Sequence, residues 1–415
     1  MLDEMRSLGR NFWLYTVGRW ISQAGWAVQD VAVPLYVLDK TGSGAMMSAF
    51  VMAELIPRLL LNPIAGVIGD RYNRKILMYG LDIARGILLF GVLAFNLLSI
   101  HQLLIVQVLM SVLGTFFSAG ISGMFPDLVE KERLAQANSI LQMGGQVIGI
   151  VGPVLGGLIY ALGGIRLAIL INAVSFFGSG LFETLIEYNW ETRKLSSVGE
   201  VWEDIVEGFL FIKNSKPLLV LVSLAVILNT LLNPVFAVVL PYLARVTLGL
   251  SSVKFGSIET AATLGALAGN LLIAGKLKEK SEGMFFRAAF MQLGILFLLV
   301  LAAHPAFRNV AYPLLIVTFL LFGFFNTLVN IPMFTKLQKA VPNEVRSRFF
   351  TALNTIVMAT TPLGMAVIGP LLNIVPVYEL VGFLLAVSFT IALAFYIKFG
   401  ETIMRVGDDV QEVVG

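Results

Sequence analysis

The sequence predicts an all-α membrane protein with twelve transmembrane helices in two pseudo-symmetric six-helix bundles, and its composition and long apolar runs are the first reasons. Of 415 residues, 57% are hydrophobic and only 13% are charged, whereas about a quarter of the residues in soluble domains are charged. The apolar runs are long enough to cross a hydrocarbon layer of about 30 Å as helices that rise about 1.5 Å per residue. Runs of this length exclude the short alternating strands of a membrane barrel.

The breakers between the apolar runs give the order of the helices. We expect the twelve spans at about residues 11–38, 44–69, 75–98, 102–127, 133–161, 164–187, 217–244, 252–276, 283–304, 309–337, 345–373 and 376–398. Most of the 29 Lys and Arg residues lie in the N-terminal segment, in loops after even-numbered helices and at the C-terminal end. By the positive-inside rule, both termini are cytoplasmic. We therefore expect a multi-pass membrane protein.

Several classes of site are excluded by composition. The chain has no cysteine, so it has no disulfide or thiolate metal site, and His101 and His304 lie near predicted helix ends. We expect no metal and no other cofactor. The net charge of +3 is spread over loops, which does not favour a nucleic-acid partner. The chain shows neither a phosphate-cradling glycine motif nor a nucleophile beside a base, so we expect no ATPase and no enzyme. Asp3 and Glu4 also make the N-terminal residues unlike a cleavable signal peptide.

Weak internal similarity at about half the chain length predicts two halves. Val129–Glu132 aligns with Val341–Glu344, and Tyr36 aligns with Tyr242. We expect a first bundle at 1–187, a linker at 188–216, a second bundle at 217–400 and a cytoplasmic tail at 401–415. Within the linker, apolar residues recur at helical spacing opposite an acidic face: Trp202, Ile205, Val206, Phe209 and Ile212. This pattern predicts an amphipathic helix along the cytoplasmic surface, and a plain connector is the alternative.

A charged stretch between the second and third spans identifies a family. Gly66–Lys75 places an aspartate and three cations between two apolar runs, and it resembles the conserved loop between helices 2 and 3 of major facilitator superfamily transporters. The resemblance implies that Asp70 sits near the N-terminus of a helix from the other half, and that Arg74 pairs with Asp127. The gating residues in this loop would be Gly66, Asp70, Arg71, Arg74 and Lys75, together with Asp127. The alternative is an ordinary basic loop.

Asn73 stands where the family usually has glycine. Asparagine is the next residue best able to adopt a left-handed backbone, so we expect it to keep a left-handed turn at this position.

A glycine-rich stretch on the fifth span gives a second motif. Gly152, Pro153, Gly156 and Gly157 resemble the glycine-proline signature of the family's drug antiporters, and would serve gating by letting helices approach and slide. Ordinary small-residue packing is the alternative. With Asp30–Leu35, Thr41–Ser43, Pro126–Val129 and Arg133–Ser139, this half resembles the branch of bacterial exporters that includes macrolide efflux proteins and the enterobactin exporter. The resemblance implies a bacterial or archaeal inner membrane. The arginine that better-known drug antiporters carry within helix 4 is missing, because no charge lies between His101 and Asp127.

Ionisable residues inside the spans suggest a proton or cation site. Charges in lipid cost several kcal/mol, so those that persist face a cavity or a partner. Asp30, Glu54 and Glu259 lie at similar predicted depth, and we expect them to couple transport to protons or to attract a cationic substrate. The alternative for Glu54 is a structural ion pair with Arg58, four residues further on; Asp30 has the same alternative with Arg19.

The fold resemblance implies a substrate cavity among helices 1, 4, 7 and 10. Polar faces and large apolar side chains give the candidate substrate-binding residues: Arg19, Gln23, Trp26, Met110, Phe116, Phe117, Gln142, Gln146, Asn229, Asn233, Phe236, Phe322, Asn326 and Asn330. Scattered donors on an apolar surface suit amphipathic molecules better than sugars. Alternatively, each amide bonds a neighbouring helix.

These features together predict a secondary transporter that exports amphipathic small molecules by alternating access, in exchange for protons. The expected partners are an amphipathic or lipid-like substrate, protons and membrane lipids, and we expect a monomer. A lysolipid or lipid flippase and a siderophore exporter of the same fold are alternatives within transport. A non-transporting membrane receptor is the alternative from another class.

Overall fold

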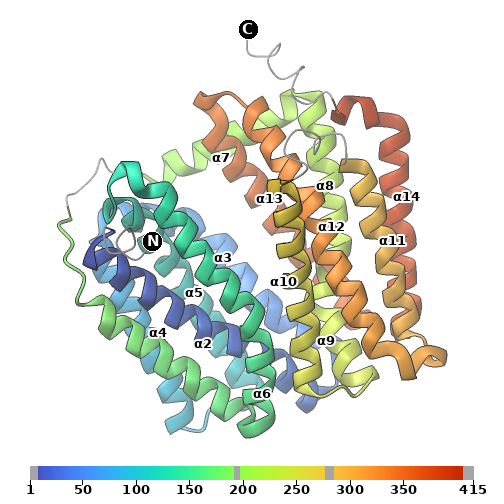
Figure 1. Ribbon diagram of the computed structural model, residues 1–415, viewed down its shortest axis with the longest axis horizontal. Helices are drawn as coiled ribbons and strands as arrows, with labels where there is room; N and C mark the ends of the chain where they lie inside the picture. Colours follow the sequence, from blue (N-terminus) through green and yellow to red (C-terminus); the bar gives the residue numbers. More distant parts are fainter. Residues whose placement is uncertain (1–7, 191–196, 276–284, 405–415) are drawn as a thin grey trace. The chain divides into compact units, whose positions relative to one another are not determined.

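The computed structural model describes residues 8–190, 197–275 and 285–404, and nearly all of them are helical (Figure 1). The first half of the chain forms five long helices: α2 (Gly9–Thr41), α3 (Gly44–Arg71), α4 (Arg74–Ala94), α5 (Ile100–Met124) and α6 (Leu134–Glu183). Two short 3-10 turns, η1 (Phe125–Asp127) and η2 (Lys131–Arg133), join α5 to α6. Within α6, Gly164 has φ 59° and ψ −157°, a conformation that only glycine adopts readily, and it divides the element into two helices.

The rest of the chain begins with α7 (Val198–Asn214), and its long helices follow in order: α8 (Lys216–Pro234), α10 (Ser252–Gly275), α11 (Phe285–Ala303), α12 (Ala311–Ala340), α13 (Asn343–Leu371) and α14 (Val377–Met404). After α8 the helix continues through a π-helical turn η3 (Val235–Val239), the short α9 (Leu240–Tyr242) and a second π-helical turn η4 (Leu243–Thr247). A 3-10 helix, η6 (Pro305–Val310), precedes α12. Pro217 near the start of α8 suits the first helical turn, where no partner for its missing N–H is needed.

The described residues contain ten helices long and apolar enough to cross a membrane. One of these, Lys131–Glu183, is 53 residues long and contains the kink at Gly164, so it supplies two crossings. The 33-residue α2 is also long enough to cross, although its polar residues keep it out of that set. The total is twelve crossings, which confirms the predicted all-α membrane fold.

The structure divides into two compact units. Unit 1 comprises Met1–Lys40, Phe50–Val201 and Ser251–Gly256, and unit 2 comprises Thr41–Ala49, Trp202–Leu250 and Ser257–Gly415. In unit 1, α4 packs on both α5 and α6. A core of large side chains, including Phe12, Tyr15 and Met124, closes the end at which the described chain begins. This core positions the ends of α4 and α5, where the candidate site begins.

In unit 2, α8 packs on α13 and α14, and α11 packs on α12 and α14 (Figure 1). Small residues allow the closest approaches. Gly265 on α10 lies against the backbone of Leu320 on α12, and Gly323 on α12 lies against the backbone of Ala262 on α10. A Cβ atom at either glycine would overlap a carbonyl oxygen. The two glycines therefore set the spacing of α10 and α12.

The predicted linker helix forms as α7 and packs on α13. Gly208 and Ile212 are buried, and Gly208 lies against the backbone of Arg348. Arg348 binds two of the four acids on α7, with Arg348 Nε 2.7 Å from Asp204 Oδ1 and its Nη1 on Glu207. Trp202, Val206 and Phe209, which the sequence placed on one apolar face with Ile212, are exposed. Residues 191–196 of the linker and 405–415 of the tail lie outside the described residues.

The spacing of α10 and α12 gives a first prediction. Gly265→Ala places a methyl group against the Leu320 carbonyl, and overpacking of this kind costs about 1–3 kcal/mol. We expect a lower melting temperature of the detergent-solubilised protein. Gly294→Ala on α11 is the matched control, because nothing lies within 4 Å of its Cβ position, and alanine favours a helix over glycine by about 1 kcal/mol. Equal melting temperatures for the two variants would contradict the packing.

Candidate functional site

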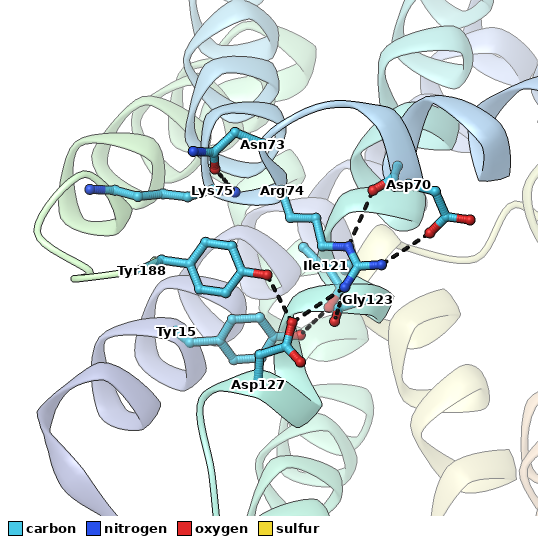
Figure 2. Close-up of polar contacts among 10 residues, drawn as sticks. Tyr15, Asp70, Asn73, Arg74, Lys75, Ile121, Gly123, Asp127 and Tyr188 are labelled. Atoms are coloured by element: carbon cyan, nitrogen blue, oxygen red, sulfur yellow. Dashed lines mark hydrogen bonds and ion pairs between the residues drawn. The ribbon is translucent and has the colours of Figure 1, made fainter. Parts of the chain in front are cut away.

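Arg74, the first residue of α4, is the centre of a polar cluster with Asp70, Asp127 and Tyr188, which we call the Arg74 cluster (Figure 2). Arg74 Nη2 lies 3.0 Å from Asp70 Oδ1, and Nη1 lies 3.3 Å from Asp127 Oδ2. Arg74 also donates from Nε to the Gly69 carbonyl at 3.2 Å and from Nη1 to the Gly123 carbonyl at 2.8 Å. Its side chain is 7% exposed. The buried guanidinium is therefore matched by two carboxylates and two carbonyls.

The local backbone explains why Arg74 reaches these partners. Asn73 caps the N-terminus of α4, because its side chain accepts a hydrogen bond from the Lys75 N–H at 3.0 Å. Its φ of −59° and ψ of 113° are not left-handed, so the expectation of a left-handed turn at Asn73 was wrong. Asparagine replaces the usual glycine here as a capping residue. Gly123 on α5 is required for another reason, since a Cβ there would overlap the guanidinium of Arg74.

Tyr188 completes the Arg74 cluster from the chain after α6. Its hydroxyl donates to Asp127 Oδ2 at 2.8 Å (Figure 2). Burial, and then the hydrogen bond to the Asp127 carboxylate, raise the pKa of Tyr188. The phenol therefore stays protonated and remains a donor throughout the physiological pH range. Asp127 carries the pairing with Arg74 that the resemblance implied, and Asp70 also binds Arg74, a contact that the sequence did not predict.

The other predicted gating residues in this loop lie around the Arg74 cluster. Gly66 and Arg71 are exposed, and Lys75 is half-buried. Gly66 has nothing within 4 Å of its Cβ position, whereas Gly69 faces Ala119 of α5. Arg74 is thus the basic residue of this loop whose side chain is tied into the bundle.

The glycines of the second motif lie where α6 meets other helices of unit 1. A Cβ at Gly152 would lie 2.7 Å from Ala27, and one at Gly156 would lie 3.2 Å from the Val28 carbonyl, both on α2. Gly157 lies against the Ser252 backbone at the start of α10, and Pro153 lies against Gly256 of the same segment. The motif therefore permits contacts of α6 with α2 and with Ser252–Gly256 that larger residues would block.

Unit 1 also contains a cavity of about 410 Å³. Its aromatic wall is formed by Trp26, Phe117 and Phe176, and Trp26 meets Phe176 edge to face at 6.0 Å. The remaining lining is polar and charged, with some apolar side chains: Arg19, Ser22, Gln23, Glu54, Arg58, Arg85, Met110, Ser111, Gly114, Thr115, Ser118 and Ile121. The cavity is more strongly charged than the sequence suggested.

The structure brings together some of the predicted substrate-binding residues of the first half and leaves others apart. Arg19, Gln23, Trp26, Met110 and Phe117 line the cavity. The cavity lining does not include Phe116, Gln142 or Gln146, and both glutamines are exposed on α6.

In unit 2, the predicted amides mostly bond within the protein. Asn229 donates to the Ala225 carbonyl at 2.8 Å, and Asn330 donates to the Asn326 carbonyl at 2.9 Å, each within its own helix. Asn233 bonds Thr361 on α13 at 3.2 Å. Asn233 therefore follows the structural alternative of a bond to a neighbouring helix, whereas Asn229 and Asn330 bond within their own helices.

Aromatic rings gather near the same region of unit 2. Phe236 on η3 stacks on Phe322 of α12 with ring centroids 4.2 Å apart, and it meets Phe319 at 5.8 Å. The predicted residues Phe236 and Phe322 are thus in direct contact.

The three predicted proton-coupling carboxylates have different surroundings. Glu54 lines the cavity and accepts a hydrogen bond from Gln107 Nε2 at 3.2 Å. Arg58 also lines the cavity and interacts electrostatically with Glu54, although the two side chains form no ion pair within the described part of the chain. Asp30 is exposed and does not line the cavity, and Glu259 lies in unit 2 on α10. Only Glu54 of the three therefore faces the cavity of unit 1.

Sequence reasoning missed a second group of charges, of which Arg85 lines the cavity while Asp82 and Glu183 do not. Asp82 and Arg85 on α4 form an ion pair, and Glu183 ends α6; both carboxyl side chains are fully buried. The Arg85 guanidinium lies between the rings of Phe117 and Phe176, 4.1 and 4.3 Å from their centroids. We call Asp82, Arg85 and Glu183 the buried triad. Two charges three residues apart inside an apolar run were the signal in the sequence.

These features define a class of protein. Twelve membrane crossings, a cavity among the helices with ionisable walls, and a buried arginine cluster at helix ends are typical of a solute transporter of the membrane.

The chain belongs to the Major Facilitator Superfamily, whose family model matches residues 15–365. The resemblance drawn from Gly66–Lys75 is therefore confirmed. The protein is a multi-pass membrane transporter and not an enzyme.

Named relatives and solved structures agree with this assignment. Macrolide efflux protein A of Streptococcus pyogenes is 21% identical, with 88% of this chain and 90% of that protein aligned. Multidrug efflux pump Tap of Mycolicibacterium fortuitum is 27% identical over 84% of this chain and 86% of that protein. The crystal structure of nucleoside transporter NupG superposes with a TM-score of 0.72 at 14% identity, covering 94% and 99% of the two chains, which shows a shared fold.

The Arg74 cluster gives a second prediction. Arg74→Gln removes the charge and most of the hydrogen bonds that hold the loop to α5, and hydrogen bonds to charged groups contribute about 1.5–3 kcal/mol each. We expect a loss of about 2 kcal/mol in the free energy of unfolding, measured by denaturant titration in detergent. Arg71→Gln, on the exposed neighbour, should leave stability within about 0.5 kcal/mol of the parent protein. Similar losses in both variants would contradict the assignment.

Proposed function

We propose that this transporter exports amphipathic small molecules by alternating access, in exchange for protons. The observation that carries the proposal is the cavity of unit 1, where an aromatic wall faces ionisable side chains. Such a surface can bury the apolar part of a molecule while charged groups hold its polar end. Efflux of macrolides and of multiple drugs, which the names of two relatives describe, fits substrates of this kind.

The cavity can orient an amphipathic substrate in a definite way. Trp26 and Phe117 offer flat apolar surface, and Met110 can adapt to different shapes because its chain is flexible. Arg19 donates to the Tyr15 hydroxyl at 3.2 Å, so its guanidinium keeps further donors for a ligand. Few residues of the cavity would impose a single hydrogen-bond pattern on a ligand. The cavity therefore favours a broad range of amphipathic substrates over sugars.

Proton exchange is the part of the proposal that rests on Glu54. Its carboxylate faces the cavity and accepts from Gln107, and no cation neutralises it by direct contact among the described residues. A carboxylate in this position can hold either a proton or the cationic end of a substrate. Asp30 and Glu259 remain further candidates for proton coupling, Asp30 on the exposed side of α2 and Glu259 in unit 2.

We assign gating to the Arg74 cluster and to the glycines of α6. The Arg74 cluster consists of ion pairs with partly exposed carboxylates, each contributing on the order of 1 kcal/mol, enough to bias two conformations without locking either. Gly152, Gly156 and Gly157 have no side chains, so α6 can move along the segments packed against it without steric clash. From the positive-inside pattern we further propose that the Arg74 cluster and both termini lie on the cytoplasmic side of a bacterial or archaeal cell membrane.

The aromatic wall supplies a test of the substrate site. We expect Trp26→Ala to raise the KM for efflux of hydrophobic dyes and macrolides from proteoliposomes by about tenfold, which corresponds to about 1.4 kcal/mol of lost binding. Trp202→Ala is the control, because this tryptophan is exposed on α7 and does not line the cavity. An unchanged KM for Trp26→Ala would exclude the cavity as the binding site.

The driving ion is tested in the same proteoliposomes. We expect an imposed pH gradient to drive dye efflux by the parent protein, and Glu54→Gln to lower that efflux while dye binding persists. Asp30→Asn and Glu259→Gln, measured in parallel, separate the contributions of the three carboxylates. Efflux that ignores the gradient would refute proton exchange. Transport of labelled lysolipids in place of dyes would favour the lipid flippase.

A further inference from the structure

The buried triad has more negative than positive charge. Asp82 pairs with Arg85, and Glu183 interacts electrostatically with both. With both carboxylates ionised, the group carries one uncompensated negative charge. An isolated buried carboxylate is costly, by several kcal/mol even after relaxation, and in practice it neutralises by binding a proton. The charges alone therefore favour one proton on the group.

The hydrogen bonds around Ser179 give an independent indication. Ser179 Oγ lies 2.8 Å from the Gly18 carbonyl and 2.9 Å from Glu183 Oε1. A hydroxyl has one proton to donate, and a carbonyl can only accept. When Ser179 donates its proton to the Gly18 carbonyl, the second contact is a full hydrogen bond if Glu183 carries a proton and donates it to Ser179 Oγ. The geometry thus fits a protonated Glu183.

Unsatisfied atoms point the same way. Asp82 Oδ2 and Glu183 Oε2 are buried and have no hydrogen-bond partner among the described residues. Removing charge from an oxygen without partners lowers the cost of burying it. Glu183 is also held tightly, because Gly18 has no side chain and its Cβ position lies 3.0 Å from Glu183 Cγ.

The helices packed around the buried triad contribute few other ionisable groups. From α2, Tyr15 and Arg19 face it, and Arg19 donates to the Tyr15 hydroxyl, which in turn lies 3.3 Å from the Ile121 carbonyl. From α5 it is faced by the ring of Phe117, and from α6 by Phe176 and Ser179. Arg19 is therefore a further cation that faces the buried triad, and it is engaged with a neutral phenol; Glu54 and Arg58 line the same cavity as Arg85.

We propose that Asp82, Arg85 and Glu183 form a proton-binding site that holds one proton between its two carboxylates and releases it during the transport cycle. The binding of the proton stands on the contacts above, whereas its release during transport rests on the proposed function. Arg85 connects the buried triad to the cavity, since it pairs with Asp82 and also lines the cavity. A positive group entering the cavity disfavours the proton, and the proton disfavours that group by the same amount.

The proton-binding step is tested without transport. Infrared difference spectra of the detergent-solubilised protein, titrated from about pH 5 to about pH 9, should show a protonated carboxylic acid band that disappears at high pH. We expect Glu183→Gln or Asp82→Asn to remove or shift this band. Glu187→Gln, four residues beyond Glu183 and exposed, should leave it unchanged. A band that is absent from the parent protein, or that persists unaltered in both triad variants, would overturn the proposal.

The release step is tested by transport. In proteoliposomes, we expect Glu183→Gln to reduce pH-gradient-driven dye efflux by about tenfold, while dye exchange at equal pH, which needs no net proton movement, stays within about twofold. If Glu183→Gln abolishes both gradient-driven efflux and dye exchange at equal pH, while the infrared band is still assigned to the triad, the triad has a structural role and the proposed coupling is refuted. If parent efflux ignores the gradient, the proposed proton exchange fails, and the infrared result still decides the site. Asp82→Asn provides a second variant if Glu183→Gln does not fold.

Discussion

The close approach of α4 to α6 is the constraint on which the functional groups of unit 1 depend. A Cβ at Gly86 on α4 would lie 2.8 Å from the backbone nitrogen of Phe177, and one at Gly180 on α6 would lie 2.9 Å from that of Ile83. At this spacing Asp82 is fully buried and Arg85 nearly so, and the two pair with each other while Arg85 packs against the rings of Phe117 and Phe176. The same helix begins at Arg74. One helix therefore fixes both the Arg74 cluster and the buried triad.

The two charged groups on α4 differ in how completely they are removed from water. In the Arg74 cluster the arginine is buried but its carboxylates are not, with Asp70 37% and Asp127 27% exposed. Water therefore screens these ion pairs, and breaking and remaking them costs little. In the buried triad all three side chains are nearly or fully inaccessible. Separating its paired charges would be costly. The group is therefore better suited to binding or releasing a proton than to breaking its ion pair.

The sequence predicted the fold well because membrane crossings depend on length and apolarity alone. It also gave the Arg74 and Asp127 pair, through a motif whose spacing is specific. It failed where the outcome depended on tertiary packing. The left-handed turn expected at Asn73 ignored its capacity to cap a helix, and Gln142 and Gln146, although correctly placed on one helix face, lie on an exposed face. Glu183 stood close to a predicted helix end, where an acid ordinarily meets water, but in the structure it is buried and Gly18 of α2 lies close against it.

The charges around the cavity have a consequence for the kind of substrate that can exchange with a proton. Three cations, Arg19, Arg58 and Arg85, stand against three carboxylates, Glu54, Asp82 and Glu183. With every group ionised the set is neutral, and one bound proton makes it positive. Two like charges about 8 Å apart repel by about 2 kcal/mol at an effective dielectric constant of about 20, which is about a 30-fold effect on affinity. A cationic amphiphile and a proton would therefore exclude one another, as exchange requires, whereas an anionic substrate would bind more tightly with the proton and would move in the same direction as it.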